Sequence, residues 1–265
     1  MFEMIIKRGR AERHPFEMFF IGFVYSSLAI PVGLYIFYSY ASLVIVFLTV
    51  LAAIHLVHGV MSLEEKKERV SRGERWLLRE HGKAFLFFLF LFLGFVVSFS
   101  FWSVVLPLEV SQHAFSVQSA IISDIEGITG NAYDVFQDLQ AILKNNFKVL
   151  VISFLFSLIY GAGVTFILAW NASVIGFAIG NLARNELGLA SLPIAFSKYL
   201  THGLLEVMAY FGVALAGGIL SIAIMRRDIK KRFRSIFFDV LVLIMISIIM
   251  LIIAGLIEVY IAPWI

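Results

Sequence analysis

The chain has 265 residues, of which 61% are hydrophobic and only 15% are charged, and its formal net charge at neutral pH is +3. Soluble proteins are about half apolar and a quarter charged, so this composition excludes an ordinary soluble domain. The absence of cysteine excludes disulfides, thiolate metal sites and cysteine nucleophiles. We therefore predict an all-α integral membrane protein, a polytopic helical bundle that forms one domain over residues 1–265 and contacts the lipid bilayer.

Six segments are apolar over about 20 residues, the length that a helix needs to cross a bilayer. They lack the alternation of barrel strands, so each is expected to be a helix. The N-terminus is a basic tail followed directly by a full-length span, so no cleavable signal peptide is expected. The six predicted spans are Phe16–Tyr38, Leu43–Met61, Ala84–Leu106, Leu150–Trp170, Tyr199–Met225 and Phe237–Ile261.

Basic residues are concentrated in three segments between or beside these spans. Residues 1–15, 62–83 and 226–234 hold 17 of the 21 Lys and Arg residues. The segment 107–147 contains five acidic residues and one lysine. By the positive-inside rule, the basic segments are cytoplasmic and 107–147 is extracytoplasmic. This places the N-terminus in the cytoplasm and the C-terminus, after a basic turn and last span over 226–265, outside.

This topology requires an odd number of crossings over residues 148–225, but only two long apolar runs lie there. We therefore expect a short or broken membrane helix over 171–192, after a break at Trp170–Asn171. The sequence leaves open whether this segment crosses the membrane or re-enters it. Gly176 and Gly180 within it have the GxxxG spacing that allows two helices to approach closely.

The outer segment 107–147 has a helical pattern of its own, because its apolar residues recur at steps of three and four. The opposite face carries acidic and amide side chains, so we predict an amphipathic extracytoplasmic helical cap. A cap of this kind is a surface on which a partner protein could dock. The apolar positions are Ala132, Val135, Phe136, Leu139, Ile142 and Leu143.

Several polar side chains fall inside the apolar runs, where an ionised group is costly. His202 and Glu206 are four residues apart and therefore share one helix face. They could form a proton relay, an ion site or two ligands of a divalent metal, or they could be a hydrogen-bonded pair that joins helices. A metal would need a third ligand from Asn171, Asn181, His113 or Glu126.

Asparagines and glycines define the rest of the predicted intramembrane features. The predicted polar intramembrane site consists of His202, Glu206, Asn171, Asn181 and Asn146. Close helix packing is expected at Gly161, Gly163, Gly176, Gly180 and Gly217. Faces of small residues also permit a homodimer. The basic segments are explained by topology and acidic lipid headgroups, so no nucleic-acid partner is expected.

These residues, in their order, resemble the stage II sporulation protein M family. The resemblance covers Ile142–Gly218 best, and the opening Ala11–Glu17 is similar to the start of archaeal-type members. One departure is Thr201, where the family pattern has proline before the His-Gly pair. The matching features are Asn145-Asn146, Gly161-Ala162-Gly163 with Thr165, Asn171, Gly176, Gly188-Leu189, His202-Gly203 and Glu206.

The resemblance implies a role without catalysis, because bacterial members are membrane anchors that recruit cell-wall-degrading enzymes during engulfment of the forespore. We therefore expect a membrane scaffold that recruits partner proteins, and not an enzyme. The alternative is a transporter, channel or metal-dependent membrane enzyme that uses a site around His202 and Glu206. The scarcity of Asn, Gln and Cys would also suit a thermophile.

Overall fold

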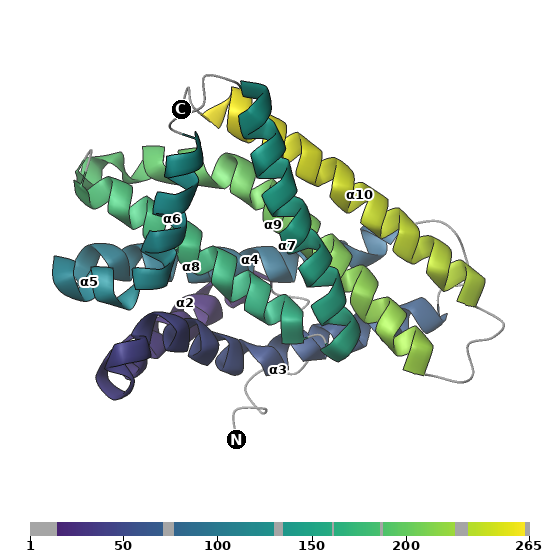
Figure 1. The fold of residues 1–265 in the computed structure, drawn as a ribbon. Helices are drawn as coiled ribbons and strands as arrows, with labels where there is room; N and C mark the ends of the chain where they lie inside the picture. Colours follow the sequence, from purple (N-terminus) through teal and green to yellow (C-terminus); the bar gives the residue numbers. More distant parts are fainter. Residues whose placement is uncertain are drawn as a thin grey trace.

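The computed structural model describes residues 15–70, 77–129, 135–160, 162–185, 188–225 and 233–262. These parts of the chain form a bundle of α-helices and contain no β-strand (Figure 1). Within them, seven helices are long and apolar enough to cross a membrane. The predicted all-α transmembrane bundle is therefore confirmed.

The long helices follow one another with short connections, apart from two smaller helices between α4 and α7. These smaller helices are α5 (Leu108–Ala114) and α6 (Ser116–Thr129). Single 3-10 turns precede α3 and α9, at Tyr38–Tyr40 and Leu189–Ser191. The seven long helices are α2 (Pro15–Ile36), α3 (Ala41–Val70), α4 (Leu77–Val105), α7 (Val135–Tyr160), α8 (Ala162–Asn185), α9 (Leu192–Met225) and α10 (Phe233–Tyr260).

The predicted break at Trp170–Asn171 is wrong, because α8 continues through both residues. Asn171 Nδ2 donates to the Ile167 carbonyl oxygen at 2.8 Å, so its side chain bonds to its own helix. Instead, α7 ends at Tyr160 and α8 begins at Ala162. The run predicted as one span, Leu150–Trp170, therefore contains parts of two helices. Two adjoining apolar helices produce one uninterrupted apolar run, which conceals the reversal between them. With α7, α8 and α9 as three crossings, the required odd number is reached.

The predicted amphipathic helix is not a separate surface cap, because residues 135–147 are the first turns of the long helix α7. Its apolar face packs on α10: a Cβ atom at Gly255 would lie 2.9 Å from Leu143 Cδ2 and 3.6 Å from Leu139 Cδ1. Helix α10 therefore covers Leu139 and Leu143 of this face, whereas Phe136 is 62% exposed. Ala132 lies outside the described residues. Among the connections that the structure describes, the one between α4 and α7 contains two α-helices, α5 and α6.

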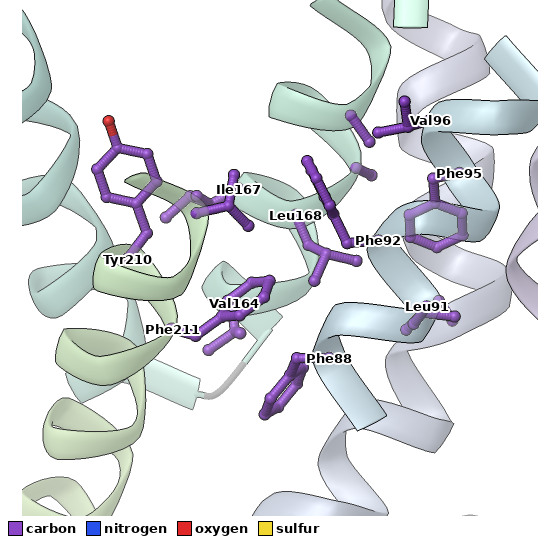
Figure 2. Close-up of a cluster of buried hydrophobic side chains, with 14 of the residues drawn as sticks. Phe88, Leu91, Phe92, Phe95, Val96, Val164, Ile167, Leu168, Tyr210 and Phe211 are labelled. Atoms are coloured by element: carbon purple, nitrogen blue, oxygen red, sulfur yellow. The ribbon is translucent and has the colours of Figure 1, made fainter. Parts of the chain in front are cut away.

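Helix α4 supplies the aromatic centre of the bundle. Figure 2 shows its Phe88, Phe92 and Phe95 opposite apolar side chains of α8 and α9. Phe88 and Phe211 of α9 are in ring contact, with centroids 5.1 Å apart. Lipid chains are as apolar as these side chains, so the contact is stabilised by dense packing and not by removal from water.

Glycines bring α4 into backbone contact with two neighbouring helices. A Cβ atom at Gly22 of α2 would lie 2.6 Å from the Leu91 carbonyl oxygen, and one at Gly94 would overlap the Phe19 carbonyl oxygen. On the other neighbour, α8, a Cβ atom at Gly176 would lie 2.7 Å from Phe99 Cβ. Since backbone atoms cannot move aside as side-chain ends can, these positions accept only glycine at the present helix spacing.

Arg184 in the last turn of α8 joins that helix to the end of α4. Its Nη2 donates to the carbonyl oxygens of Val104 and Leu106. The last carbonyls of a helix lack partners in their own helix and carry the negative end of its dipole. The guanidinium group therefore supplies both the hydrogen bonds and the charge that this helix end needs.

Replacing Gly94 with alanine should destabilise the protein by about 1–3 kcal/mol, because the added methyl group overlaps backbone of α2. Gly82 of the same helix is the control, since a Cβ there would meet nothing within 4 Å. Gly82→Ala should be neutral or stabilising by up to about 1 kcal/mol. Unfolding in mixed detergent micelles measures both changes, and equal effects of the two substitutions would contradict this packing.

Candidate functional site

Three polar side chains from α7, α9 and α10 meet inside the bundle. Asn146 Nδ2 donates a hydrogen bond to Glu206 Oε1, and the carboxyl groups of Glu206 and Glu258 are hydrogen-bonded to each other. Tyr210, one turn after Glu206 on α9, lies close enough to both carboxyl groups for their charges to act on its hydroxyl group. We name Asn146, Glu206 and Glu258 the carboxyl site.

The carboxyl site lies toward the end of the bundle at which α7 begins and α10 ends. Figure 1 shows these two helix ends beside each other, and the contact between Gly255 and Leu143 holds them together. Asn146 is 6% exposed, so the amide is almost completely enclosed. An isolated charge at this depth would be costly, and the polar groups instead satisfy one another.

Local sequence explains how Glu206, Tyr210 and Asn146 come to lie at the site. Glu206 and Tyr210 are four residues apart on α9 and therefore share a face. Asn146 lies on the buried face of α7, while Lys144 and Lys148, two residues away on each side, are exposed. A step of two residues turns a helix by about 200°, so a lysine–asparagine–lysine alternation separates the cations from the buried amide.

His202 and Glu206 share a helix face, but no hydrogen bond joins them in the described structure. His202 Nδ1 is buried without a hydrogen-bond partner. The charged group that acts on the imidazole is Lys198, one turn earlier on the same helix. Glu206 is bonded instead to α7 and α10.

The residues considered as third metal ligands are dispersed. Among the described residues, no three His, Cys, Asp or Glu side chains gather closely enough to hold a metal ion. His113 of α5 stacks on Tyr38 with ring centroids 4.0 Å apart, and its Nε2 lies 2.6 Å from the Tyr38 carbonyl oxygen. Asn171 bonds within α8, which also carries Asn181, and the Glu126 side chain lies outside the described part.

The glycines predicted for helix packing lie at contacts between different pairs of helices. Gly163 faces Phe156 of α7, while Gly176 and Gly180 face α4. A Cβ atom at Gly217 of α9 would lie 2.8 Å from the Phe154 carbonyl oxygen of α7. Gly161 lies outside the described residues. Of these described contacts, that of Gly217 lies between two helices that carry the carboxyl site, α9 and α7.

The sequence interpretation missed Glu258, which completes the carboxyl site. It is the one acidic residue inside the last predicted span apart from Asp239 near its start. An acidic side chain in an apolar run is itself a signal of an intramembrane function or contact. Its position near the end of the run makes it look like a residue of the membrane–water interface, and only the fold shows that it meets Glu206.

A second enclosed polar cluster fixes α6 to the bundle. Gln118 is fully buried; it accepts a hydrogen bond from Ser42 Oγ of α3 at 2.6 Å and donates one to Ser173 Oγ of α8 at 3.0 Å. The Val117 backbone N–H donates to the same Ser42 oxygen. These bonds satisfy an amide that would otherwise be buried at considerable cost, and they join three helices.

The Asn146–Glu206 contact should appear as a coupling energy in a double-mutant cycle. Asn146→Leu and Glu206→Met each leave a buried polar partner unpaired, so the double variant should cost about 0.5–3 kcal/mol less than the sum. Asn171→Leu is the matched control, since that amide bonds only within α8. Its effect should add to that of Glu206→Met within about 0.5 kcal/mol. Detergent unfolding measures all variants, and additivity at Asn146 would refute the contact.

Comparison with known proteins places these features in a family. A sequence model of stage II sporulation protein M matches residues 83–263, which run from within α4 to the end of α10 and include all three members of the carboxyl site. An uncharacterised protein of Methanocaldococcus jannaschii is 31% identical over 131 residues, which are 48% of this chain and 71% of the relative. No solved structure is significantly similar. The chain is a multi-pass membrane protein that belongs to the stage II sporulation protein M family.

Proposed function

We propose that this protein is a membrane scaffold that recruits a partner protein to the outer surface of the membrane. The observation that carries the proposal is the attachment of α5 and α6 to the transmembrane helices by several buried contacts. A scaffold must hold its docking surface in a fixed position relative to the membrane. The helices α5 and α6, which we name the platform, meet this requirement.

Buried contacts hold the platform at several points along its length. Ser111 Oγ donates to the Ser103 carbonyl oxygen of α4 at 2.9 Å. Phe115 is almost fully buried and stacks on Phe177 of α8, with ring centroids 5.3 Å apart. The buried Gln118 adds its bonds to α3 and α8. The platform is thus attached to three of the spanning helices.

The opposite side of the platform is exposed and mostly polar. Within each of the two helices, exposed residues recur at steps of three and four, so each helix turns one side away from the bundle. A polar helical face that the bundle does not cover is suited to bind another protein. The exposed residues described in the two helices are Leu108, Glu109, Gln112, Ser116, Ala120 and Ser123.

We infer from the charge distribution that the platform is extracytoplasmic, the N-terminus cytoplasmic and the C-terminus extracytoplasmic. With seven spans, the basic segments 1–15, 62–83 and 226–234 all fall on one side, and the platform falls on the other. This is the arrangement that the positive-inside rule favours.

Cysteine labelling can test this orientation cleanly, because the natural chain has no cysteine. A membrane-impermeant maleimide should label Glu109→Cys in intact cells. It should label Lys83→Cys, exposed near the start of α4, only after the membrane is opened. The opposite pattern would invert the topology and place the platform in the cytoplasm.

Cross-linking from the exposed face of the platform tests the scaffold function. A photoreactive maleimide on Gln112→Cys should form one discrete adduct with another protein in native membranes. The matched control is Leu155→Cys, which is 52% exposed on the membrane-spanning helix α7 and should react mainly with lipid. An adduct whose mass equals two chains would identify the partner as a second copy. The absence of any protein adduct at Gln112, or equal adducts at both positions, would refute a docking role for the platform.

A second candidate function is transport or channel activity at the carboxyl site, and Glu258 is the observation that favours it. Two carboxyl groups inside a membrane bundle are groups that ion and proton pathways use. In vesicles containing the purified protein, Glu206→Ala and His202→Ala would then abolish or reduce ion flux. Unchanged flux and unchanged metal content in both variants would remove this candidate and the predicted His202–Glu206 metal pair.

A further inference from the structure

We propose that Glu206 and Glu258 share a single proton. The hydrogen bond that this proton forms between the two carboxyl groups holds the end of α10 to α9. A carboxyl group accepts a hydrogen bond from another carboxyl group only if one of them carries a proton. The hydrogen bond between the two side chains therefore defines a proton-binding site. Sequence resemblance and the scaffold function do not imply this site.

The surroundings of the pair favour one proton over two charges. Two carboxylates in contact repel each other strongly in a low-dielectric interior, as in pairs of acids that retain one proton between them. Asn146 donates to Glu206 Oε1, which stabilises one negative charge on the pair but not two. Within the described residues, neither carboxyl group forms an ion pair that could balance a second charge.

In the part of the chain that the structure describes, the ionisable groups on the surrounding helices do not supply that second countercharge. Lys144 and Lys148 of α7 are exposed on the face opposite Asn146. Arg184 of α8 donates to the end of α4. On α9, Lys198 acts on His202, and Tyr210 is neutral when protonated. Tyr260, two residues after Glu258 on α10, is exposed.

The position of the pair determines what the proton controls. Helix α10 packs mainly against α9 and α7, the two helices that carry Glu206 and Asn146. Loss of the proton to water would leave two charges in contact between α9 and α10. Those charges would weaken this end of the interface, whereas the contact of Gly212 with Ser247 farther along it contains no ionisable group. The carboxyl site is thus a protonation-dependent contact between α9 and the end of α10, which we name the latch.

Infrared spectroscopy can detect the shared proton directly. Carboxyl groups exposed to water are ionised at neutral pH, so a carboxylic-acid carbonyl band at that pH must come from an enclosed, protonated group. The wild-type protein in detergent should show this band, and Glu206→Gln and Glu258→Gln should each lose it. In either variant the amide can donate to the remaining carboxylate, and no proton is needed. Glu109→Gln on the exposed platform is the control and should retain the band.

Two outcomes of this experiment would overturn the proposal. A wild-type protein without the band holds no proton at the pair. A band that remains in either single variant belongs to one carboxyl group alone or to another residue, so the proton is not shared. Size-exclusion chromatography and circular dichroism establish that each variant is folded, and the wild-type spectrum is decisive even if a variant is not.

Thermal unfolding as a function of pH tests the latch. The folded protein holds a proton that separated carboxyl groups in water have already lost at neutral pH, so its stability must decrease as pH rises. From about pH 6 to about pH 9, the melting temperature of the wild type and of Glu109→Gln should fall. The double variant Glu206→Gln/Glu258→Gln should lose most of this dependence. An unchanged dependence in the double variant, or wild-type stability that rises with pH, would refute the latch. If the scaffold function were disproved, the infrared spectra and melting curves expected here would stay the same, because they depend only on the carboxyl pair.

Discussion

Close approach of helix backbones around α4 is the contact on which the rest of this bundle depends. Gly94 and Gly22 bring α2 and α4 into backbone contact, and Gly176 brings α8 against the opposite part of α4. Because lipid solvates apolar side chains as well as another helix does, dense packing of this kind is a main contribution to helix association. The phenylalanines of α4 then fill the space toward α8 and α9 (Figure 2). The hydrogen bonds of Arg184 from α8 to the end of α4 form at the helix spacing that these contacts set.

The polar residues complement this packing by specifying which helices are neighbours. Gln118 joins α6 to α3 and α8, Arg184 joins α8 to α4, and the carboxyl site joins α7, α9 and α10. Glycine contacts alone tolerate several arrangements, whereas an unpaired amide or carboxyl group in the bilayer is costly in every wrong arrangement. The platform proposed to bind a partner is held by the hydrogen bonds of Gln118, whereas the proton latch is the carboxyl site. The two proposals therefore concern different parts of the molecule.

The class of fold could be predicted because apolar length and the positions of Lys and Arg report directly on the bilayer. The reversal between α7 and α8 could not, since both helices are apolar and their junction carries only the small residues around residue 161. The face of Leu139 and Leu143 was correctly periodic, but periodicity does not reveal whether lipid or Gly255 of α10 covers it. Asn146 and Glu206 stood out as polar residues in apolar surroundings. Their meeting with Glu258, more than 50 residues farther along, depends on the tertiary fold alone.

The bond between Arg184 and the end of α4 has a consequence for biosynthesis. The guanidinium group and its acceptor Val104 are 80 residues apart in the chain. At about 5–20 residues per second, a ribosome takes roughly 4–16 s to synthesise that interval. The last carbonyls of α4 must therefore rely on water during this time, which the water-facing end of a helix permits. Insertion of α8, the fifth span, then replaces that water with the arginine. The end of α4 therefore reaches its final contacts only when this span is complete.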